Sequence, residues 1–277
     1  MIVWQNKESK EKIDALCRLV PRKKFELLTL DCLCRENDGT FSRAETETGR
    51  LPDRSFRSFF MYYEGKRLVG ELYVFPLTDN SAEITAIVDP CRRRSGIFTK
   101  LYDLAKEEME KYGIADWFFV AEPDCRDARE VLGHMNLSAV RSEYIMEAGY
   151  IDLKSFDEAD SKVTLLFEEG DGTVTALLTA TGASERENML IGQAKAVGSG
   201  NEAFIFEVEI EKDHRGRGYG GRIISGLIKH LEESAPGMKY RLQVSSDNKA
   251  ACGLYRKLGF RVAKQLDYFT VDKNKKP

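Results

Sequence analysis

The stretch that decides the fold runs from Glu207 to Gly221 and reads EVEIEKDHRGRGYGG. Its opening residues alternate apolar and acidic side chains, which predicts a strand with one buried face. A basic turn with Arg215 and Arg217 follows, and four glycines then lead into IISGLIKHLEE, an amphipathic helical pattern. A strand that feeds a glycine-rich turn at a helix start leaves backbone N–H groups pointing outward, where they can bind phosphate. The sequence therefore predicts a pyrophosphate site here.

The dinucleotide-binding pattern G-x-G-x-x-G is an alternative, because Gly216, Gly218 and Gly221 satisfy it. That fingerprint normally lies in the first strand–helix unit and requires an acid about 20 residues later, at the end of the next strand. Here the motif lies in the last quarter of the chain, and the next apolar stretch, Tyr240–Val244, carries Gln243 in place of an acid. The sequence therefore disfavours dinucleotide binding.

A second motif follows the first. Asn248 opens a short helical pattern that continues as Leu254–Tyr255–Arg–Lys–Leu–Gly259–Phe260. With these residues the chain resembles the GNAT superfamily of acetyl-CoA-dependent N-acetyltransferases, whose coenzyme loop has the form R/Q-x-x-G-x-G/A. The resemblance implies that acetyl-CoA is the co-substrate. The residues that it assigns to coenzyme binding are Val208, Ile210, Arg215, Gly216, Arg217, Gly218, Tyr219, Gly220, Gly221 and Asn248.

The same arrangement occurs earlier in the chain. Ile84–Phe98 contains a strand, a basic turn and a helix start, and a further strand and helix follow it up to Met135. Arg93 to Met135 spans 42 residues, and Arg215 to Leu258 spans 43. We therefore expect a tandem duplication, similar to the mycothiol synthase type, with domains at 1–151 and 152–277. The implied fold is α/β (α+β): each domain is a mixed, mostly antiparallel sheet flanked by helices, with splayed central strands that hold the coenzyme.

The first copy departs from the pattern. Phe98 replaces the last small residue of the loop, Leu132 aligns with Tyr255, and Asn136–Leu137 replaces the Gly–Phe ending. We expect this copy to be degenerate in catalysis. The resemblance still assigns it the coenzyme-binding residues Val88, Arg93, Arg94, Ser95 and Gly96.

The resemblance also suggests catalytic roles in the second copy. Tyr255 stands at the position of the general acid that protonates the leaving thiolate, and a phenol remains protonated at neutral pH. The alternative is that Tyr255 is only an amphipathic residue on a surface helix. Glu207 and Glu209 are candidates for the base, although proton removal through water is an equal alternative. The backbone around Val208 is expected to bulge and to polarise the thioester carbonyl.

Composition narrows the function class. The net charge is −3, which gives no general attraction to nucleic acid or to an anionic membrane. The longest apolar runs are too short to span a membrane, and the N-terminus becomes polar too soon for a signal peptide. Six cysteines without a disulfide spacing indicate reduced thiols in the cytoplasm, and the three histidines give little basis for a metal site.

The remaining pattern predicts the elements around these motifs. We expect a strand at 1–5, helices at 9–20 and 25–35, a hairpin of 57–63 with 68–75, and a closing segment at 140–150. Ile151–Lys162 is polar and acidic and is expected to be the linker. Four strands then precede the second loop without any helix, so the second copy should lack the first copy's two-helix cover. The expected reaction is acetyl transfer from acetyl-CoA to a primary amine of a small molecule. A protein amine as the acceptor, and a non-catalytic acetyl-CoA sensor, are the alternatives.

Overall fold

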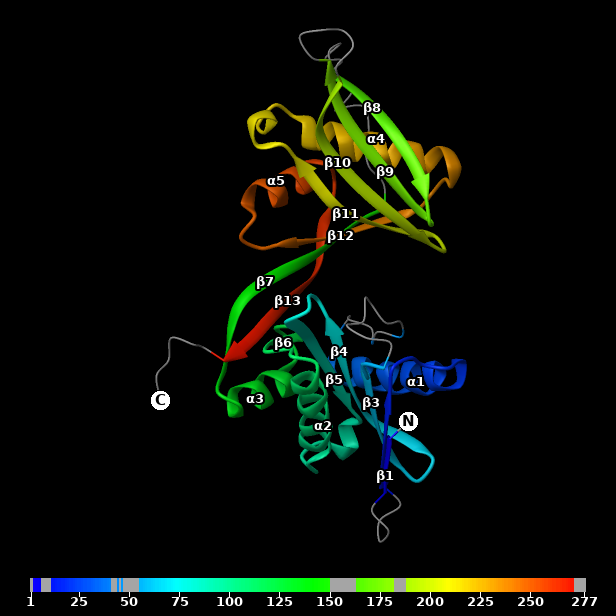
Figure 1. The fold of residues 1–277 in the computed structure, drawn as a ribbon, viewed down its shortest axis with the longest axis vertical. Helices are drawn as coiled ribbons and strands as arrows, with labels where there is room; N and C mark the ends of the chain where they lie inside the picture. The colour runs from blue at the N-terminus through cyan, green and yellow to red at the C-terminus, as the bar shows by residue number, and fades with distance from the viewer. Residues whose placement is uncertain are drawn as a thin grey trace. The chain divides into compact units, whose positions relative to one another are not determined.

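The computed structural model describes residues 2–5, 11–40, 44, 46, 55–149, 163–181 and 188–271. The predicted linker, Ile151–Lys162, lies outside these residues. The chain divides into two compact units, the first made of Met1–Arg141 with Leu266–Pro277 and the second of Ser142–Gln265. Figure 1 shows the course of the chain through both units.

The first unit contains one mixed sheet with strand order β1-β2-β3-β4-β5-β6-β13. The pair β5–β6 is parallel, and the others described in this unit are antiparallel. Its elements are β1 (Ile2–Gln5), β2 (Glu11–Leu16), α1 (Pro21–Asp38), β3 (Phe59–Glu64), β4 (Arg67–Pro76), β5 (Ser81–Val88), η1 (Pro90–Arg92), α2 (Ile97–Lys111), β6 (Asp116–Ala121) and α3 (Arg126–His134).

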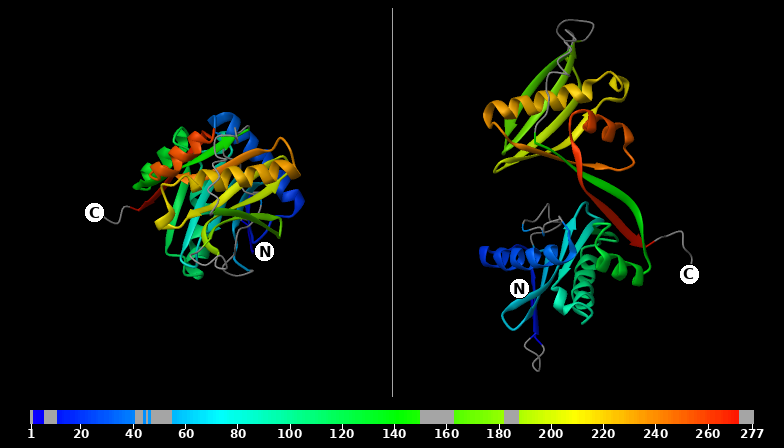
Figure 2. Two further views of the ribbon diagram at one scale, coloured as in Figure 1. Left: turned by 90° about the horizontal axis from the view of Figure 1, so that it is seen from above. Right: turned by 180° about the vertical axis from the view of Figure 1, so that it is seen from behind.

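Helices cover both faces of this first sheet. On one face α2 buries Leu101 and Met109 against strand residues such as Leu72. On the other face α1 buries Leu27 and Leu30. In Figures 1 and 2 these helices lie on opposite sides of the strands. The first unit is therefore a three-layer sandwich.

The predicted helix at 9–20 is wrong, because Glu11–Leu16 forms strand β2. Ile13 and Leu16 have the i, i+3 spacing of a helix face, yet they pack into different clusters on opposite faces of the sheet. The helix begins later, at Pro21, where the missing N–H of proline is tolerated, and Gly39 ends it with a φ of 67°. The predicted helix at 25–35 lies within it. One helix, rather than two, thus precedes the hairpin in the described residues.

The second unit contains a sheet with strand order β7-β12-β11-β10-β9-β8. All four strands predicted before the second loop are confirmed. Its elements are β7 (Leu137–Ala148, from Ser142 on), β8 (Val163–Gly170), β9 (Thr173–Thr181), β10 (Asn188–Ser199), β11 (Glu202–Ile210), η3 (Lys212–His214), α4 (Tyr219–Ser234), β12 (Lys239–Ser245), α5 (Lys249–Lys257) and β13 (Arg261–Val271, up to Gln265).

The division between the units differs from the expected domain boundary at 151/152. Residues 143–148 of β7 pair with β12, and Met146 and Ala148 belong to the core of the second unit. The segment 140–150 was expected to close the first domain. Conversely, residues 267–269 of β13, which were expected in the second domain, pair with β6 and belong to the first unit.

Helix α4 packs on the sheet of the second unit through Ile223, Ile224 and Leu227, which are fully buried. It covers one face only: β8, β9 and β10 lie in front of it in Figure 1, and it lies in front of them when the molecule is turned around in Figure 2. Where α1 separates β2 from β3 in the first unit, β8 and β9 are joined by the turn Asp171–Gly172, whose φ angles of 51° and 75° are typical of tight hairpins.

Candidate active site

The glycine-rich loop of the second unit ends at an uncapped helix start. Gly218 is the N-cap of α4 with a φ of 82° and supplies no side-chain hydrogen bond. Gly216 also has a positive φ, of 79°. The first backbone N–H groups of α4 therefore have no partner from a capping side chain, which leaves them to an anionic ligand. This is the geometry that the sequence predicted for a pyrophosphate site.

The two arginines of this loop are positioned by backbone carbonyls rather than by acids. The Nε of Arg215 donates to the Ile210 carbonyl at 2.8 Å, and Nη2 of Arg217 donates to the Asp213 carbonyl at 3.1 Å. Both side chains are exposed, and neither forms an ion pair with any residue that the structure describes. Their charges are therefore available to a ligand at the start of α4.

Strand β11 bulges where it approaches this loop. Glu207 has a φ of 48°, and the ladder with β10 passes from Phe206↔Lys195 to Glu209↔Gln193, which leaves Glu207 and Val208 opposite a single residue. The parallel pairing with β12 ends at Ile205↔Leu242, although both strands continue. The expected bulge and strand separation are thus present, and backbone groups around Val208 are freed from the sheet.

Tyr255 lies on α5 and is only 6% exposed. Its ring packs edge-on against Phe260 with centroids 6.0 Å apart. Burial raises the pKa of the Tyr255 phenol above its usual value of about 10. The hydroxyl therefore stays protonated throughout the neutral range, as a general acid must. Asn248 caps the same helix, since its Oδ1 accepts from the Ala251 backbone at 3.1 Å.

The candidate bases differ in their surroundings. Glu207 forms an ion pair with Lys195, at 2.6 Å from Nζ, whereas Glu209 is exposed and forms no ion pair within the described part of the chain. Glu207 is therefore already engaged by a cation, whereas Glu209 meets none among the described residues. Gln243, on β12, donates to Glu143 and is not a base.

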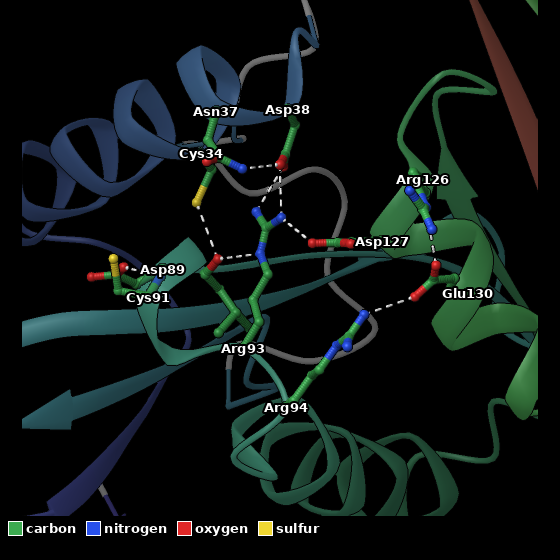
Figure 3. Close-up of polar contacts among 11 residues, drawn as sticks. Cys34, Asn37, Asp38, Asp89, Cys91, Arg93, Arg94, Arg126, Asp127 and Glu130 are labelled. Atoms are coloured by element: carbon green, nitrogen blue, oxygen red, sulfur yellow. Dashed lines mark hydrogen bonds and ion pairs between the residues drawn. The ribbon is translucent and has the colours of Figure 1, made fainter.

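The corresponding loop of the first unit is occupied by the protein itself (Figure 3). Arg93 repeats the backbone contact of Arg215, with Nε 3.0 Å from the Val88 carbonyl. Its guanidinium also holds Asp38 through two hydrogen bonds of 2.7 Å and Asp127 through one of 2.5 Å. The carboxylates of Asp38 and Asp127 therefore occupy positions around the Arg93 guanidinium that the phosphate oxygens of a ligand could otherwise take.

Further differences separate the first loop from the second. Arg94 takes a φ of 62°, where the second loop has Gly216, and it pairs with Glu130 at 3.1 Å. The hydroxyl of Ser95 donates to the Arg92 carbonyl, and Gly96 caps α2 with a φ of 79°. Phe98 packs inward against Phe119, and Leu132, which aligns with Tyr255 in the sequence, is buried.

The central strand of the first unit also lacks the bulge. β4 and β5 pair without a break from Pro76↔Ala82 to Gly70↔Val88, so the backbone of Val88 stays in the ladder. The parallel pairing of β5 with β6 does end early, at Ile84↔Phe119. The first unit therefore keeps the separation of the strands but not the freed backbone groups or an available arginine.

Three residues that the sequence did not predict form ion pairs with predicted site residues. Asp38 and Asp127 pair with Arg93, and Lys195 pairs with Glu207. Asp38 and Asp127 lie 55 and 34 residues from Arg93. Lys195 meets Glu207 through strand pairing. No motif marks any of the three, because each contact depends on which elements pack together.

Comparison with known proteins bears on this site. Residues 136–260 match the Acetyltransferase (GNAT) family. The match covers a little under half of the chain. The N-acetyltransferase 9-like protein of Schizosaccharomyces pombe is 36% identical over 64 residues, which cover 21% of this chain and 30% of that relative. The alignment spans less than a third of that relative's own length.

Solved structures show that the GNAT-like fold extends beyond the matched region. A GCN5-related N-acetyltransferase from Sphaerobacter thermophilus has a TM-score of 0.75 at 14% identity and aligns over 94% of this chain and 95% of its own. A tandem GNAT protein from the clavulanic acid biosynthesis pathway has a TM-score of 0.69 at 15% identity, over 94% and 97%. At these identities the likeness concerns the fold.

Among the described residues, no group of three or more histidine, cysteine, aspartate or glutamate side chains is arranged to hold a metal ion. No described helix is long and apolar enough to cross a membrane.

Proposed function

We propose that the second unit transfers an acetyl group from acetyl-CoA to a primary amine. The observation that carries this proposal is the free arginine pair beside the uncapped start of α4, next to a strand whose backbone has left the sheet. Arg215, Arg217 and the N–H groups at 216–221 would hold the pyrophosphate, and Asn248 would add a contact through its amide nitrogen. The backbone of Val208 and Ile210 would hold the pantetheine arm and polarise the carbonyl.

Few side chains take part directly in the proposed acetyl transfer. The neutral amine attacks the thioester carbonyl carbon, the C–S bond breaks, and the phenol of Tyr255 gives its proton to the leaving thiolate. The amine loses a proton to water or to Glu209, which has no competing cation, while Glu207 stays paired with Lys195. Holding amine and thioester in line would supply much of the acceleration.

We further propose that the two units are a tandem pair, similar to the mycothiol synthase type, and that one coenzyme binds per chain. Arg93 and Arg215 make the same contact to a carbonyl five residues earlier, and positive φ values recur at matching loop positions. These features favour a common origin. The carboxylates around Arg93 would exclude coenzyme from the first loop, where we had expected Val88, Arg93, Arg94, Ser95 and Gly96 to bind it.

The test is an amine panel assayed with acetyl-CoA by detection of the released thiol, alongside calorimetry with coenzyme A. We expect turnover with small primary amines and a stoichiometry of one. Turnover only with peptides would point to a protein acceptor. Coenzyme binding without turnover on any amine or peptide would point to a sensor.

A further inference from the structure

Within the second unit, no described element covers the face of the sheet that lies away from α4. In the first unit the matching face is covered by α1, which buries Leu27 and Leu30. In the second unit the turn Asp171–Gly172 replaces that helix. The uncovered face carries Leu166, Val197 and Phe204, which are 47%, 39% and 38% exposed. We call it the outer face.

Two aromatic rings lead along the outer face to the proposed reaction site. Phe204 and Phe206 point to the same side of β11, and their rings stack with centroids 6.3 Å apart at 19°. The bulge at Glu207 follows directly, and Glu209 lies beyond it. At about 3.4 Å of rise per residue, the backbone positions of Phe206 and Glu209 are roughly 10 Å apart. An apolar platform thus borders the gap between β11 and β12.

Acidic side chains outnumber basic ones among the charged residues considered on the outer face. The cation Arg241 is shared by Glu147 and Glu202, at 2.6 and 2.9 Å, and Lys195 is paired with Glu207 at 2.6 Å. Glu209 remains without a cation among the described residues. The end of the outer face nearest the gap is therefore negative, which complements an ammonium group and disfavours an acidic ligand.

We propose that the acceptor is a primary amine joined by a short spacer to an aromatic or bulky apolar group. The amine end lies at Glu209 beside the gap, and the apolar end packs on Phe204 and Phe206, which determine specificity. This inference rests on the proposed acetyl transfer and names the class of amine. Burial of an apolar group on this platform favours binding, and a hydroxylated amine gains much less of that burial.

The test compares two amines with the same four-carbon chain, 4-phenylbutylamine and 4-aminobutan-1-ol, by kcat/KM with acetyl-CoA. We expect the phenyl amine to be preferred by at least tenfold. The double variant F204A/F206A should lose that preference, mainly through a higher KM, while its affinity for coenzyme A stays unchanged and shows that it is folded. The control is F25A, which removes a phenylalanine that is 73% exposed on α1 of the first unit, and it should change neither value.

Three results would overturn this inference while leaving acetyl transfer in place. These are equal turnover of both amines, a preference that survives in F204A/F206A, or peptides acetylated tenfold better than either amine. Coenzyme binding with no turnover of any amine or peptide would instead overturn the proposed function, and this inference with it.

Discussion

Arg93 and Asp38 form a two-pronged ion pair, in which Nη1 and Nη2 each lie 2.7 Å from a different carboxylate oxygen. The pair joins the end of α1 to the loop before α2, and Asp127 at the start of α3 completes it. An arginine that resembles a ligand-binding residue in sequence is thus used to hold three elements of the first unit together.

The first prediction concerns the stability that this ion pair provides. Burial tends to raise the pKa of Asp38, but hydrogen bonds from Arg93 and Asn37 bring it below its usual value. A lowered pKa in the folded state adds stability above the unfolded value of about 3.9, and this stability is lost as the pH falls further. D38N should therefore lower the free energy of unfolding at pH 7 by about 1–3 kcal/mol. In denaturant titrations the difference should shrink below pH 4.

The second prediction concerns coenzyme binding at Gly218. A β-branched residue is strained at a φ of 82°, and its side chain would enter the open space in front of α4. G218V should weaken coenzyme A binding by roughly 100-fold or more, equivalent to about 2.8 kcal/mol. The matched control is G96V, at a φ of 79° in the first loop, which should leave the affinity unchanged by calorimetry. Equal losses in both variants would contradict the assignment of the second loop.

The third prediction concerns Tyr255. Y255F should lower kcat by about 100-fold or more, while the affinity for acetyl-CoA stays nearly intact, because the hydroxyl acts in the transition state. Conservative changes at the buried Leu132 should leave turnover unaltered. Full activity in Y255F together with loss of activity in an Arg93 variant would mean that the first unit is catalytic.

The fourth prediction follows from the raised pKa of Tyr255. Burial disfavours the phenolate, so the pKa of this acid lies above its usual value of about 10. We expect kcat to rise with deprotonation of the amine and to show no descending limb between pH 8 and 10. A descending limb in this range, seen in the wild type and absent from Y255F, would contradict the raised pKa of Tyr255.

The fifth prediction concerns the integrity of the second unit. A fragment from Lys162 to the C-terminus omits residues 143–148 of β7, which pair with β12 and contribute Met146 and Ala148 to the core. The bare edge of β12 should make it poorly soluble or inactive. A fragment that begins at Leu137 restores this strand and should be more soluble. Full activity of the shorter fragment in the thiol assay would show that β7 is dispensable.

Much of the candidate site could be predicted from the sequence, since it depends on neighbours within one strand, one turn and one helix. The spacing of Arg215 and Gly218 reflects the local geometry of one turn, and the position of Tyr255 follows from the second motif, on α5. The bulge at Glu207 and the helix start at Gly218 appear where the pattern indicated. The failed helix at 9–20 shows the limit of such patterns, since a spacing of three also fits a strand with two buried faces.

Tertiary structure decided which of the two loops is available. Arg93 and Arg215 sit in equivalent turns, yet α1 and α3 bring Asp38 and Asp127 to the first, while the second has no equivalent of α1 in the described residues. Tertiary structure also assigned residues 142–148 to the second core and left the outer face bare. Such outcomes depend on contacts between residues far apart in the chain, so no local spacing encodes them.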